Sequence, residues 1–248
     1  MELIAEFFRD LRATTGLNFT IFYDPFDVAR FWRAFLVTCE LAALSVVLSI
    51  AIGIVGAFGQ GARFRPVAWF VNAYVAFFRN TPPLVQMYFF FFALGAITPT
   101  VPDDIGMEVP LVSSFAWALI ALSLFAGAFN VEIFRSGIEA VPRSTLEAAE
   151  ALGYSRLGAY RSIVLPLAFR VCLPSLNNNL VNLVKTTTLA YAIGVPEMLY
   201  VANQIWSDSM NVTEMMNVLL LLYIGLVSFL VWLMHRWERA MRMPGYGT

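Results

Sequence analysis

The chain carries Glu147-Ala148-Ala149-Glu150-Ala151-Leu152-Gly153 and, ten residues beyond that glycine, Ile163-Val164-Leu165-Pro166. Glu, Ala and Leu are among the best helix formers, so the first segment on its own predicts only a helix. Ser144 and Glu147 have the spacing of a capping box, which predicts that this helix begins near Ser144. Gly153 is a typical helix stop, and Ser155 is a typical cap for a second helix. The segment is therefore expected to form a helix, a glycine turn and a second helix.

The composition indicates a membrane protein. Of 248 residues, 59% are hydrophobic and 13% are charged, about half the charged share of a soluble domain. A water-soluble core of this length cannot bury so much apolar surface, so the lipid bilayer is the expected solvent. A net charge of −1 argues against nucleic acid as a partner. Cys39 and Cys172 both lie in apolar runs, where they are expected to be small buried side chains and not metal ligands or a disulfide.

Five stretches are apolar and long enough to cross a bilayer, the second only when its two parts are taken together. They cover about residues 34–58, 67–97, 111–131, 171–195 and 215–234. The second stretch is interrupted by Arg-Asn-Thr-Pro-Pro at 79–83, where the two prolines are expected to kink the helix. The sequence therefore predicts an all-α integral membrane protein with five transmembrane helices.

The arginines predict the orientation of these helices. The loops at 98–110 and 196–214 contain no Lys or Arg, whereas the loop after the third span contains five arginines. These five are Arg135, Arg143, Arg156, Arg161 and Arg170. Because cytoplasmic loops are rich in Lys and Arg, this loop and the C-terminus are assigned to the cytoplasm, and an odd number of spans puts the N-terminus outside. One observation conflicts, since residues 1–33 contain four arginines.

This orientation suggests a division of the chain into three parts. Residues 1–33 form an N-terminal external segment. Residues 34–235 form the transmembrane domain, which includes a cytoplasmic loop at about 137–170. Residues 236–248 form a cytoplasmic tail.

The spacing Glu-Ala-Ala, three residues, Gly, nine residues, Ile-x-Leu-Pro resembles the cytoplasmic loop of ABC importer permeases at every defined position. In that family the loop forms a short coupling helix that docks into a groove on an ATPase subunit. The resemblance implies that the ATPase-coupling residues are Glu147, Ala148, Ala149, Leu152, Gly153, Ile163, Leu165 and Pro166.

Further motifs resemble the polar amino acid branch of these permeases, which handles histidine, glutamate, glutamine, arginine and opines. Residues 78–86 are similar to that branch's R-x-T-P-x-L-V-Q signature, and residues 132–138 to its E-x-x-R-x-G-I segment. The end of the chain, at 244–247, is similar to the short tail of many members. The branch also has five spans with an external N-terminus, in the type I ABC importer permease fold. One departure is Lys-Thr-Thr-Thr-Leu at 185–189, where the branch commonly has an acidic residue after the lysine.

The resemblance also implies the partners and the cellular location. The chain is expected in the cytoplasmic (inner) membrane of a bacterium, paired with a second permease that is identical or related. An ABC ATPase dimer would bind beneath the pair with ATP and magnesium, and an extracytoplasmic amino acid-binding protein would deliver the substrate. The chain itself lacks a P-loop, and His235 is its single histidine. No cofactor in this chain and no enzymatic activity of its own are therefore predicted.

Polar residues inside the spans are candidates for the substrate path. Asn178, Asn182 and Lys185 follow one another at spacings of four and three, which places them on one face of a helix, and Thr188 continues that face. Lys185 would pair with an α-carboxylate, and the amides would donate or accept hydrogen bonds. The alternative is that the asparagines bond between helices and that Lys185 reaches the headgroups.

Three more residues are assigned to the path with open alternatives. Glu132 either faces the cavity and binds an ammonium group or forms a simple ion pair with Arg135, one helical turn away. Arg79 and Gln86 share a face only if the helix continues through Pro82 and Pro83, and this broken segment either lines a pore or relieves packing.

A different class of function competes with the importer. A self-sufficient secondary transporter or channel for small polar solutes would also be apolar and multi-spanning. It predicts inverted repeats or an acidic ion-coupling residue at mid-membrane, and neither is evident in the sequence.

Overall fold

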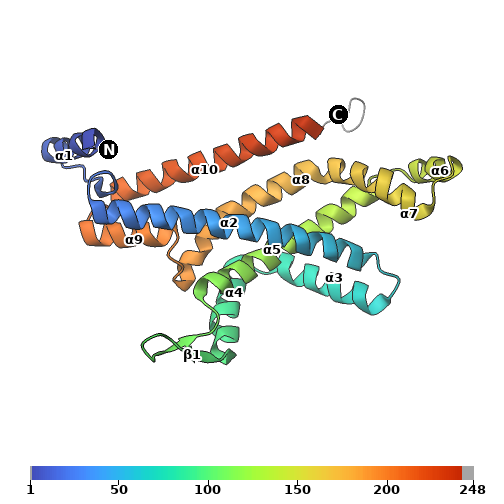
Figure 1. Ribbon diagram of the computed structural model, residues 1–248, viewed down its shortest axis with the longest axis horizontal. Helices are drawn as coiled ribbons and strands as arrows, with labels where there is room; N and C mark the ends of the chain where they lie inside the picture. Colours follow the sequence, from blue (N-terminus) through green and yellow to red (C-terminus); the bar gives the residue numbers. More distant parts are fainter. Residues whose placement is uncertain (1, 242–248) are drawn as a thin grey trace. The chain divides into compact units, whose positions relative to one another are not determined.

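The computed structural model describes residues 2–241 and consists mainly of helices (Figure 1). The tail motif at 244–247 lies outside the described residues. By contacts the chain divides into two compact units, which interleave along the sequence. Unit 1 comprises residues 2–44, 84–121 and 185–228, and unit 2 comprises residues 45–83, 122–184 and 229–241.

The elements follow one another along the chain with short connections. The first half contains α1 (Glu2–Thr15), the 3-10 turn η1 (Thr20–Phe22), α2 (Pro25–Gln60), α3 (Arg65–Asn80), α4 (Pro83–Tyr88), the π-helix η2 (Phe89–Leu94), the 3-10 turn η3 (Gly95–Ile97), β1 (Thr100–Pro102) and β2 (Glu108–Pro110). The second half contains α5 (Ser114–Glu139), α6 (Arg143–Ala151), α7 (Arg156–Ala159), the π-helix η4 (Tyr160–Val164), α8 (Leu165–Thr186), the 3-10 helix η5 (Thr187–Ile193), α9 (Met198–Ser209) and α10 (Val212–Met241).

Four helical segments are long and apolar enough to cross a membrane. They are Pro25–Gln60, Ser114–Glu139, Arg156–Ile193 and Val212–Met241. They contain the first and fifth predicted spans and all but two or three residues of the third and fourth. At 1.5 Å per residue the 36 residues of α2 extend about 54 Å, well beyond a hydrocarbon core of about 30 Å. α10 likewise continues to Met241, so the predicted tail is helical in its described part.

The second predicted span is divided where the sequence indicated. α3 ends at Asn80 and α4 begins at Pro83. Pro82 lacks a backbone N–H, and the residue before a proline is driven out of the helical conformation, so no helix continues through Thr81. The apolar helix that follows, Pro83–Ile97, is shorter than a bilayer span.

Unit 1 has an apolar core formed by α2, α9 and α10. Its buried residues include Phe31, Ala34, Val201, Ile205 and Met215. Polar bonds fix the start of α9 against this core. The Thr38 hydroxyl accepts a hydrogen bond from the Met198 N–H at 3.0 Å. The buried Glu197 carboxylate caps α9 by accepting from the N–H groups of Leu199 and Tyr200.

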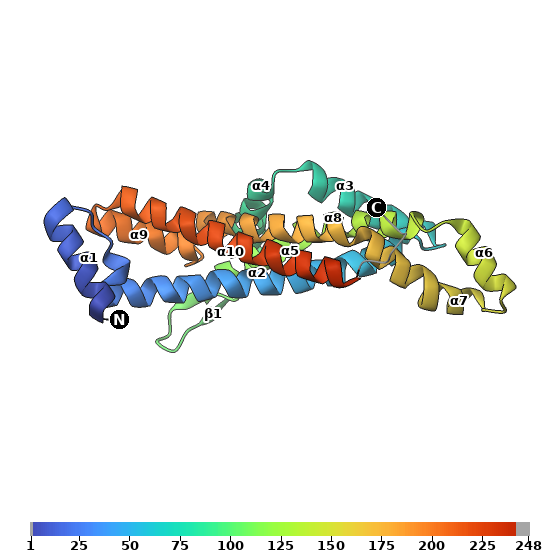
Figure 2. The same cartoon turned by 90° about the horizontal axis from the view of Figure 1, so that it is seen from above.

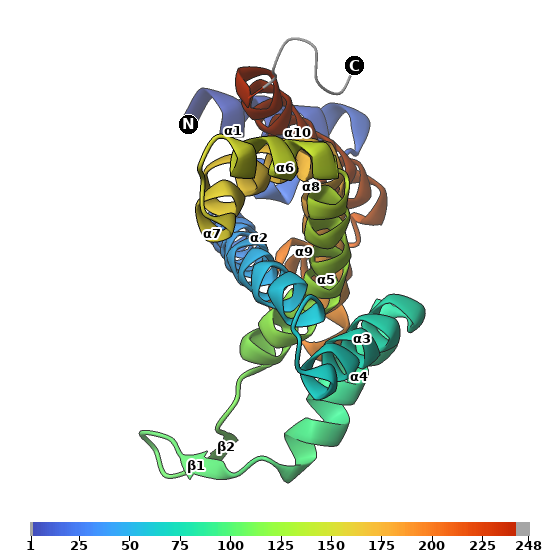
Figure 3. The ribbon, with the colours of Figure 1, turned by 90° about the vertical axis from the view of Figure 1, so that its right-hand side faces the viewer.

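The connection between η3 and α5 is not purely irregular, because β1 and β2 pair there as a small antiparallel hairpin (Figure 3). The Asp103 carboxylate closes the turn by accepting hydrogen bonds from the N–H groups of Ile105 and Met107. Gly106 supplies the left-handed conformation of this turn, with φ of +80°. The all-helical prediction is therefore correct for the spans, and this hairpin is the exception among the described residues.

Small residues bring the helices of unit 2 close together. A Cβ atom added to Gly53 would lie 2.4 Å from the Cβ of Asn130, and one added to Gly137 would lie 2.8 Å from the Ala168 carbonyl oxygen. Glycine is therefore required where α2 and α8 each approach α5, as is common where membrane helices pack closely.

A ladder of buried polar side chains, formed by Ser49, Asn130 and Asn179, also lies in unit 2. The Asn179 amide donates to the Asn130 side chain at 2.8 Å, and Asn130 donates to the Ser49 hydroxyl at 3.2 Å.

Candidate functional site

The loop between α5 and α8 contains the Glu-Ala-Ala segment, which forms α6. Figure 2 shows α6 and α7 as the two limbs of this loop. The predicted capping box is wrong, because the N-cap residue is Pro142 and no side chain caps the first turn. The proline ring holds φ near the helical value, at −57°, so the helix begins one residue before Ser144.

The end of α6 is as predicted. Gly153 has φ of +87°, a left-handed conformation that glycine adopts at no steric cost. The Tyr154 N–H donates to the Ala149 carbonyl at 3.1 Å, and the Gly153 N–H donates to the Glu150 carbonyl at 3.0 Å. These two bonds form a Schellman motif. The Ser155 hydroxyl then accepts from the Gly158 N–H at 3.2 Å, so Ser155 caps α7 as predicted.

The two faces of α6 have different environments. Ala149 is buried, and Leu146 packs against a small core formed by Val141, Val164 and Ala168. Glu147 and Ala148, by contrast, are exposed. The four residues Glu-Ala-Ala-Glu therefore contribute one internal contact and three solvent-facing side chains.

The tip of the loop carries exposed apolar side chains. Leu152 is 79% exposed and Leu157 is 80% exposed, one on each side of the glycine turn. Arg156 and Arg161 on the second limb and Glu147 on the first are also exposed. An apolar tip flanked by charges of both signs is suited to docking on another protein, with leucine in the centre and charges at the rim.

Ile163, Leu165 and Pro166 lie where the second limb becomes α8. Ile163 is half-buried in the π-helix η4, and Leu165 and Pro166 begin α8. Pro166 has no N–H to donate to the preceding turn, and a wider π turn is a common way to accommodate such an interruption. The Ile-x-Leu-Pro part of the motif therefore joins the loop to a candidate membrane span.

The predicted polar stripe on α8 is exposed. Asn178, Asn182 and Lys185 each have exposed side chains, whereas the adjacent Asn179 is buried and bonded to α5. The face does not continue to Thr188 as an α-helix, because the chain turns into the 3-10 helix η5 at Thr187. The Thr188 hydroxyl instead donates to the Lys185 carbonyl at 2.9 Å.

Glu132 lies at the centre of a charged cluster in unit 2. Its carboxylate accepts hydrogen bonds from Gln60 at 2.8 Å and from Arg135 at 2.8 Å, and Arg79 approaches to 3.8 Å. Arg135 also pairs with Glu139 at 2.7 Å. Of the two alternatives for Glu132, this geometry favours the ion pair, because both carboxylate oxygens already have donors.

Arg79 and Gln86 belong to different helices, since the chain is not helical between Asn80 and Pro83. Arg79 is exposed and places its guanidinium 5.4 Å from the centre of the Phe129 ring, a cation–π distance. Gln86 is buried in α4. The shared face on a continuous helix is therefore absent.

Three polar residues of these networks were not predicted from the sequence. Gln60 bonds to Glu132, and Ser49 and Asn130 complete the ladder to Asn179. A polar residue within an apolar span is a signal that its side chain has a partner, and Asn130 carries that signal. Gln60, at the end of α2, carries none.

Taken together, the long apolar helices define the class as a membrane-embedded protein, and the α6–α7 loop is its exposed connection. Residues 30–243 match the family described as the binding-protein-dependent transport system inner membrane component. The match covers most of the chain, so the protein belongs to this family.

Two relatives and one solved structure support the same family. The octopine transport system permease protein OccM of Rhizobium radiobacter is 33% identical over 215 residues, covering 84% of this chain and 86% of the relative. The L-cystine transport system permease protein TcyB of Bacillus subtilis is 30% identical, covering 84% of each. A crystal structure described as an amino acid ABC transporter with histidines is 25% identical, with a TM-score of 0.75, covering 86% of this chain and 94% of that one.

These findings confirm the central prediction. The chain is the permease subunit of an ABC importer, a multi-pass membrane protein with a type I permease fold. It is a transport component, and in this class ATP hydrolysis is carried out by a separate subunit.

Proposed function

We propose that the chain forms one half of the path by which polar amino acids, or opines derived from them, are imported. Named relatives carry octopine or cystine, and a similar solved structure is that of an amino acid transporter. Each of these solutes is zwitterionic, with at least one carboxylate and one ammonium group. The exposed stripe of Asn178, Asn182 and Lys185 on α8 offers amides and an ammonium group for such a solute.

The α6–α7 loop couples this path to an ATPase. The single observation that carries this role is the exposed pair Leu152 and Leu157 beside the exposed Glu147. Leu146 and Ala149 hold the inner face of α6 on the protein, so a movement of the docked ATPase is passed through η4 into α8. The remaining residues of the motif act here as structure: Gly153 makes the turn, and Ile163, Leu165 and Pro166 form the junction with the span.

The complete importer contains two permeases, identical or related, an ABC ATPase dimer that binds ATP and Mg²⁺, and an extracytoplasmic binding protein. The chain crosses the cytoplasmic membrane of a bacterium five times, and the pair α3 and α4 forms the broken second span. The loop is cytoplasmic and the N-terminus external, which follows from the arginines of the loop and the lack of Lys and Arg at 98–110 and 196–214. Of the other residues predicted to line the path, Glu132 and Arg79 lie in an ion-paired cluster and Gln86 is buried, so the proposed substrate contacts rest on the α8 stripe.

The proposal is tested by substrate-stimulated ATP hydrolysis in the co-purified complex in lipid, wild type against Glu147→Arg. The exposed position of Glu147 means that the substitution leaves the fold intact, which circular dichroism checks. We expect loss of stimulation or of the bound ATPase. Unaided amino acid transport by this chain, with the variant silent, would support the secondary transporter instead. The substrate class is tested by comparing wild type with Lys185→Met in the transport of amino acids and of the corresponding amines, which lack the α-carboxylate.

A further inference from the structure

The N-terminal segment before α2 is the part of the chain that the family does not explain. The family match begins at residue 30, so α1 and η1 lie outside it. α1 is nevertheless a regular helix of 14 residues, and none of its side chains is buried. A helix of this length without a fully buried side chain is marginal in water, so a further contact is needed to stabilise it.

α1 is strongly amphipathic. Its large apolar residues are Leu3, Ile4, Phe7, Phe8 and Leu11, and its charged residues are Glu2, Glu6, Arg9, Asp10 and Arg12. At 100° per residue, the apolar set occupies one continuous arc and the charged set occupies the other. Leu3 is 84% exposed and Phe7 is 61% exposed, so much of the apolar arc has no cover among the described residues.

The orientation of α1 is fixed by contacts at its C-terminal half. The Phe8 ring stacks on Phe22, with ring centres 4.4 Å apart, and meets Phe19 edge-on. On the charged side, Arg12 donates to the Tyr23 hydroxyl at 3.0 Å. The helix is therefore held by η1, while Leu3, Ile4 and Phe7 remain exposed.

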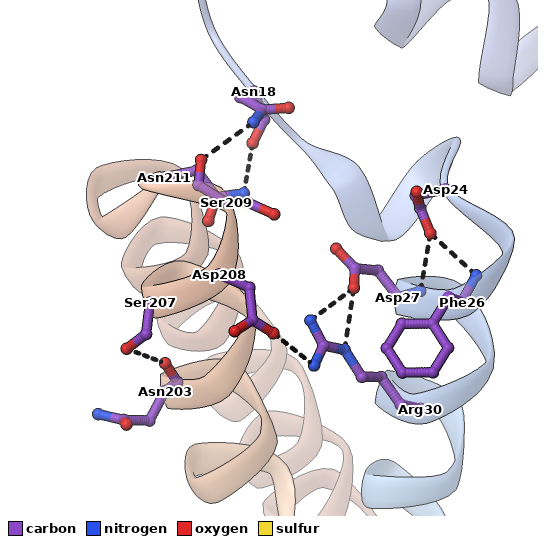
Figure 4. A network of polar contacts seen from close by, with 10 residues as sticks. All are labelled: Asn18, Asp24, Phe26, Asp27, Arg30, Asn203, Ser207, Asp208, Ser209 and Asn211. Atoms are coloured by element: carbon purple, nitrogen blue, oxygen red, sulfur yellow. Dashed lines mark hydrogen bonds and ion pairs between the residues drawn. The ribbon is translucent and has the colours of Figure 1, made fainter.

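The connection between α1 and η1 is in turn tied by polar bonds of Asn18 to the α9–α10 turn, as Figure 4 shows, and to the first turn of α10. The Asn211 amide donates to the Asn18 carbonyl at 2.7 Å, and the Asn18 N–H donates to the Glu214 carboxylate at 2.8 Å. An ion pair of 2.9 Å between Arg30 and Asp208 joins α2 to α9 close by. These bonds hold the N-terminal segment to one end of the helices of unit 1.

This end coincides with the boundary of the apolar zone. Glu214 directly precedes the apolar stretch 215–234 of α10, so Asn18 lies at the level where hydrocarbon begins. Met210, which precedes Asn211, is 89% exposed, and Phe26 and Trp32 are exposed near the start of α2. Exposed aromatic and apolar side chains at this level are typical of the membrane–water interface.

We propose that α1 lies in the interfacial layer of the bilayer, with Leu3, Ile4 and Phe7 inserted between lipid headgroups and the charged arc in water. A lipid surface is the occupant because the bonds of Asn18 hold this segment at the level where the apolar stretch of α10 begins, the level at which α2 and the α9–α10 turn also expose apolar side chains. α1 has three acidic and two basic residues, so burial of apolar area and not attraction to anionic lipid holds it there. The proposed topology assigns this surface to the outer leaflet, but the insertion itself does not depend on that assignment.

The test compares neighbouring positions on the two arcs. The two native cysteines are replaced (Cys39→Ala, Cys172→Ala), and Phe7→Cys or Glu6→Cys is labelled with an environment-sensitive fluorophore. The complete importer is placed in nanodiscs of phosphatidylethanolamine and phosphatidylglycerol. One set of discs contains lipid with a nitroxide just below the headgroup, and the other receives a water-soluble nickel chelate. Ile4→Cys, labelled in the same way, is a second position on the apolar arc. Retained ATP hydrolysis shows that each labelled complex is intact.

We expect the lipid nitroxide to quench the label at residues 4 and 7 at least about twofold more than at residue 6, and the nickel chelate to show the opposite order. Equal access of the chelate to residues 6 and 7 would overturn the proposal. Shielding of residue 7 from both quenchers would also overturn it, because a protein surface would then cover the arc. Neither result bears on coupling through the α6–α7 loop, so failure here is distinguishable from failure of the proposed function.

Discussion

Replacing Leu152 and Leu157 with serine is expected to release the ATPase without disturbing the permease. Each leucine is about four-fifths exposed in the isolated chain, so nearly all of its apolar surface is available for burial in a partner. Complete burial of a leucine side chain contributes about 1.5–3 kcal/mol, which scales here to about 1–2 kcal/mol for each residue. Since 1.4 kcal/mol is a factor of ten, each single variant should weaken binding roughly tenfold, and the double variant roughly a hundredfold.

The assay is the equilibrium binding of the purified ATPase subunit to the permease in nanodiscs, followed by surface interferometry. Leu111→Ser is the matched control, because Leu111 is also exposed but lies next to the β1–β2 hairpin, outside the α6–α7 loop. All variants should retain the thermal stability of the wild type. Unchanged affinity in Leu152→Ser, Leu157→Ser and their combination would refute the assignment of the loop tip as the docking surface.

Substitutions at five further residues test individual parts of the structure. Gly153→Val should destabilise the α6–α7 turn by about 1–2 kcal/mol, because a β-branched residue is strained at the positive φ of this position. Gly153→Asn should destabilise the turn less, and the two variants are compared by their substrate-stimulated ATP hydrolysis. Asn130→Ala and Asn179→Ala should show a coupling of about 0.6–1.7 kcal/mol in a double-mutant cycle of unfolding in bicelles, and additive effects would contradict their hydrogen bond. Glu197→Ala removes the cap of α9 and should lower stability by about 0.5–2 kcal/mol, measured by thermal denaturation against Glu197→Asp. Glu132→Gln should reduce stability and leave the KM for transport unchanged, whereas a raised KM at unchanged stability would show that Glu132 binds substrate.

Features that depend on neighbouring residues were predictable from the sequence. The break of the second span follows from Pro82 and Pro83, and the turn after α6 follows from Gly153, because proline and glycine act on the backbone directly. The position of each long span followed from apolar runs that only a bilayer can accommodate. Even so, the capping box at Ser144 was wrong, since Pro142, two residues earlier, is the N-cap and the helix begins at Arg143.

Features that depend on distant residues were not predictable. Gln60 and Glu132 are 72 positions apart and their bond has no local signal.

The change from α8 to a 3-10 helix at Thr187 is a local feature that was also not predicted. Threonine hydroxyls compete with backbone N–H groups for backbone carbonyls, and the Thr188 hydroxyl donates to the Lys185 carbonyl in this way. A helical pattern in the sequence does not show where such a hydroxyl replaces the N–H group.

The two faces of α8 indicate what the permease still requires. Asn179 is buried and bonded to the Ala126 carbonyl and to Asn130, so its amide contributes to the packing of unit 2. Asn178, the residue before it, is exposed at the same depth along the helix. An amide facing hydrocarbon lacks the partners that water would supply, and burying a polar group without them is costly. The exposed face of α8 must therefore be covered in the membrane by water or by another polar surface. A path formed with a second permease would supply both, as the proposed function requires.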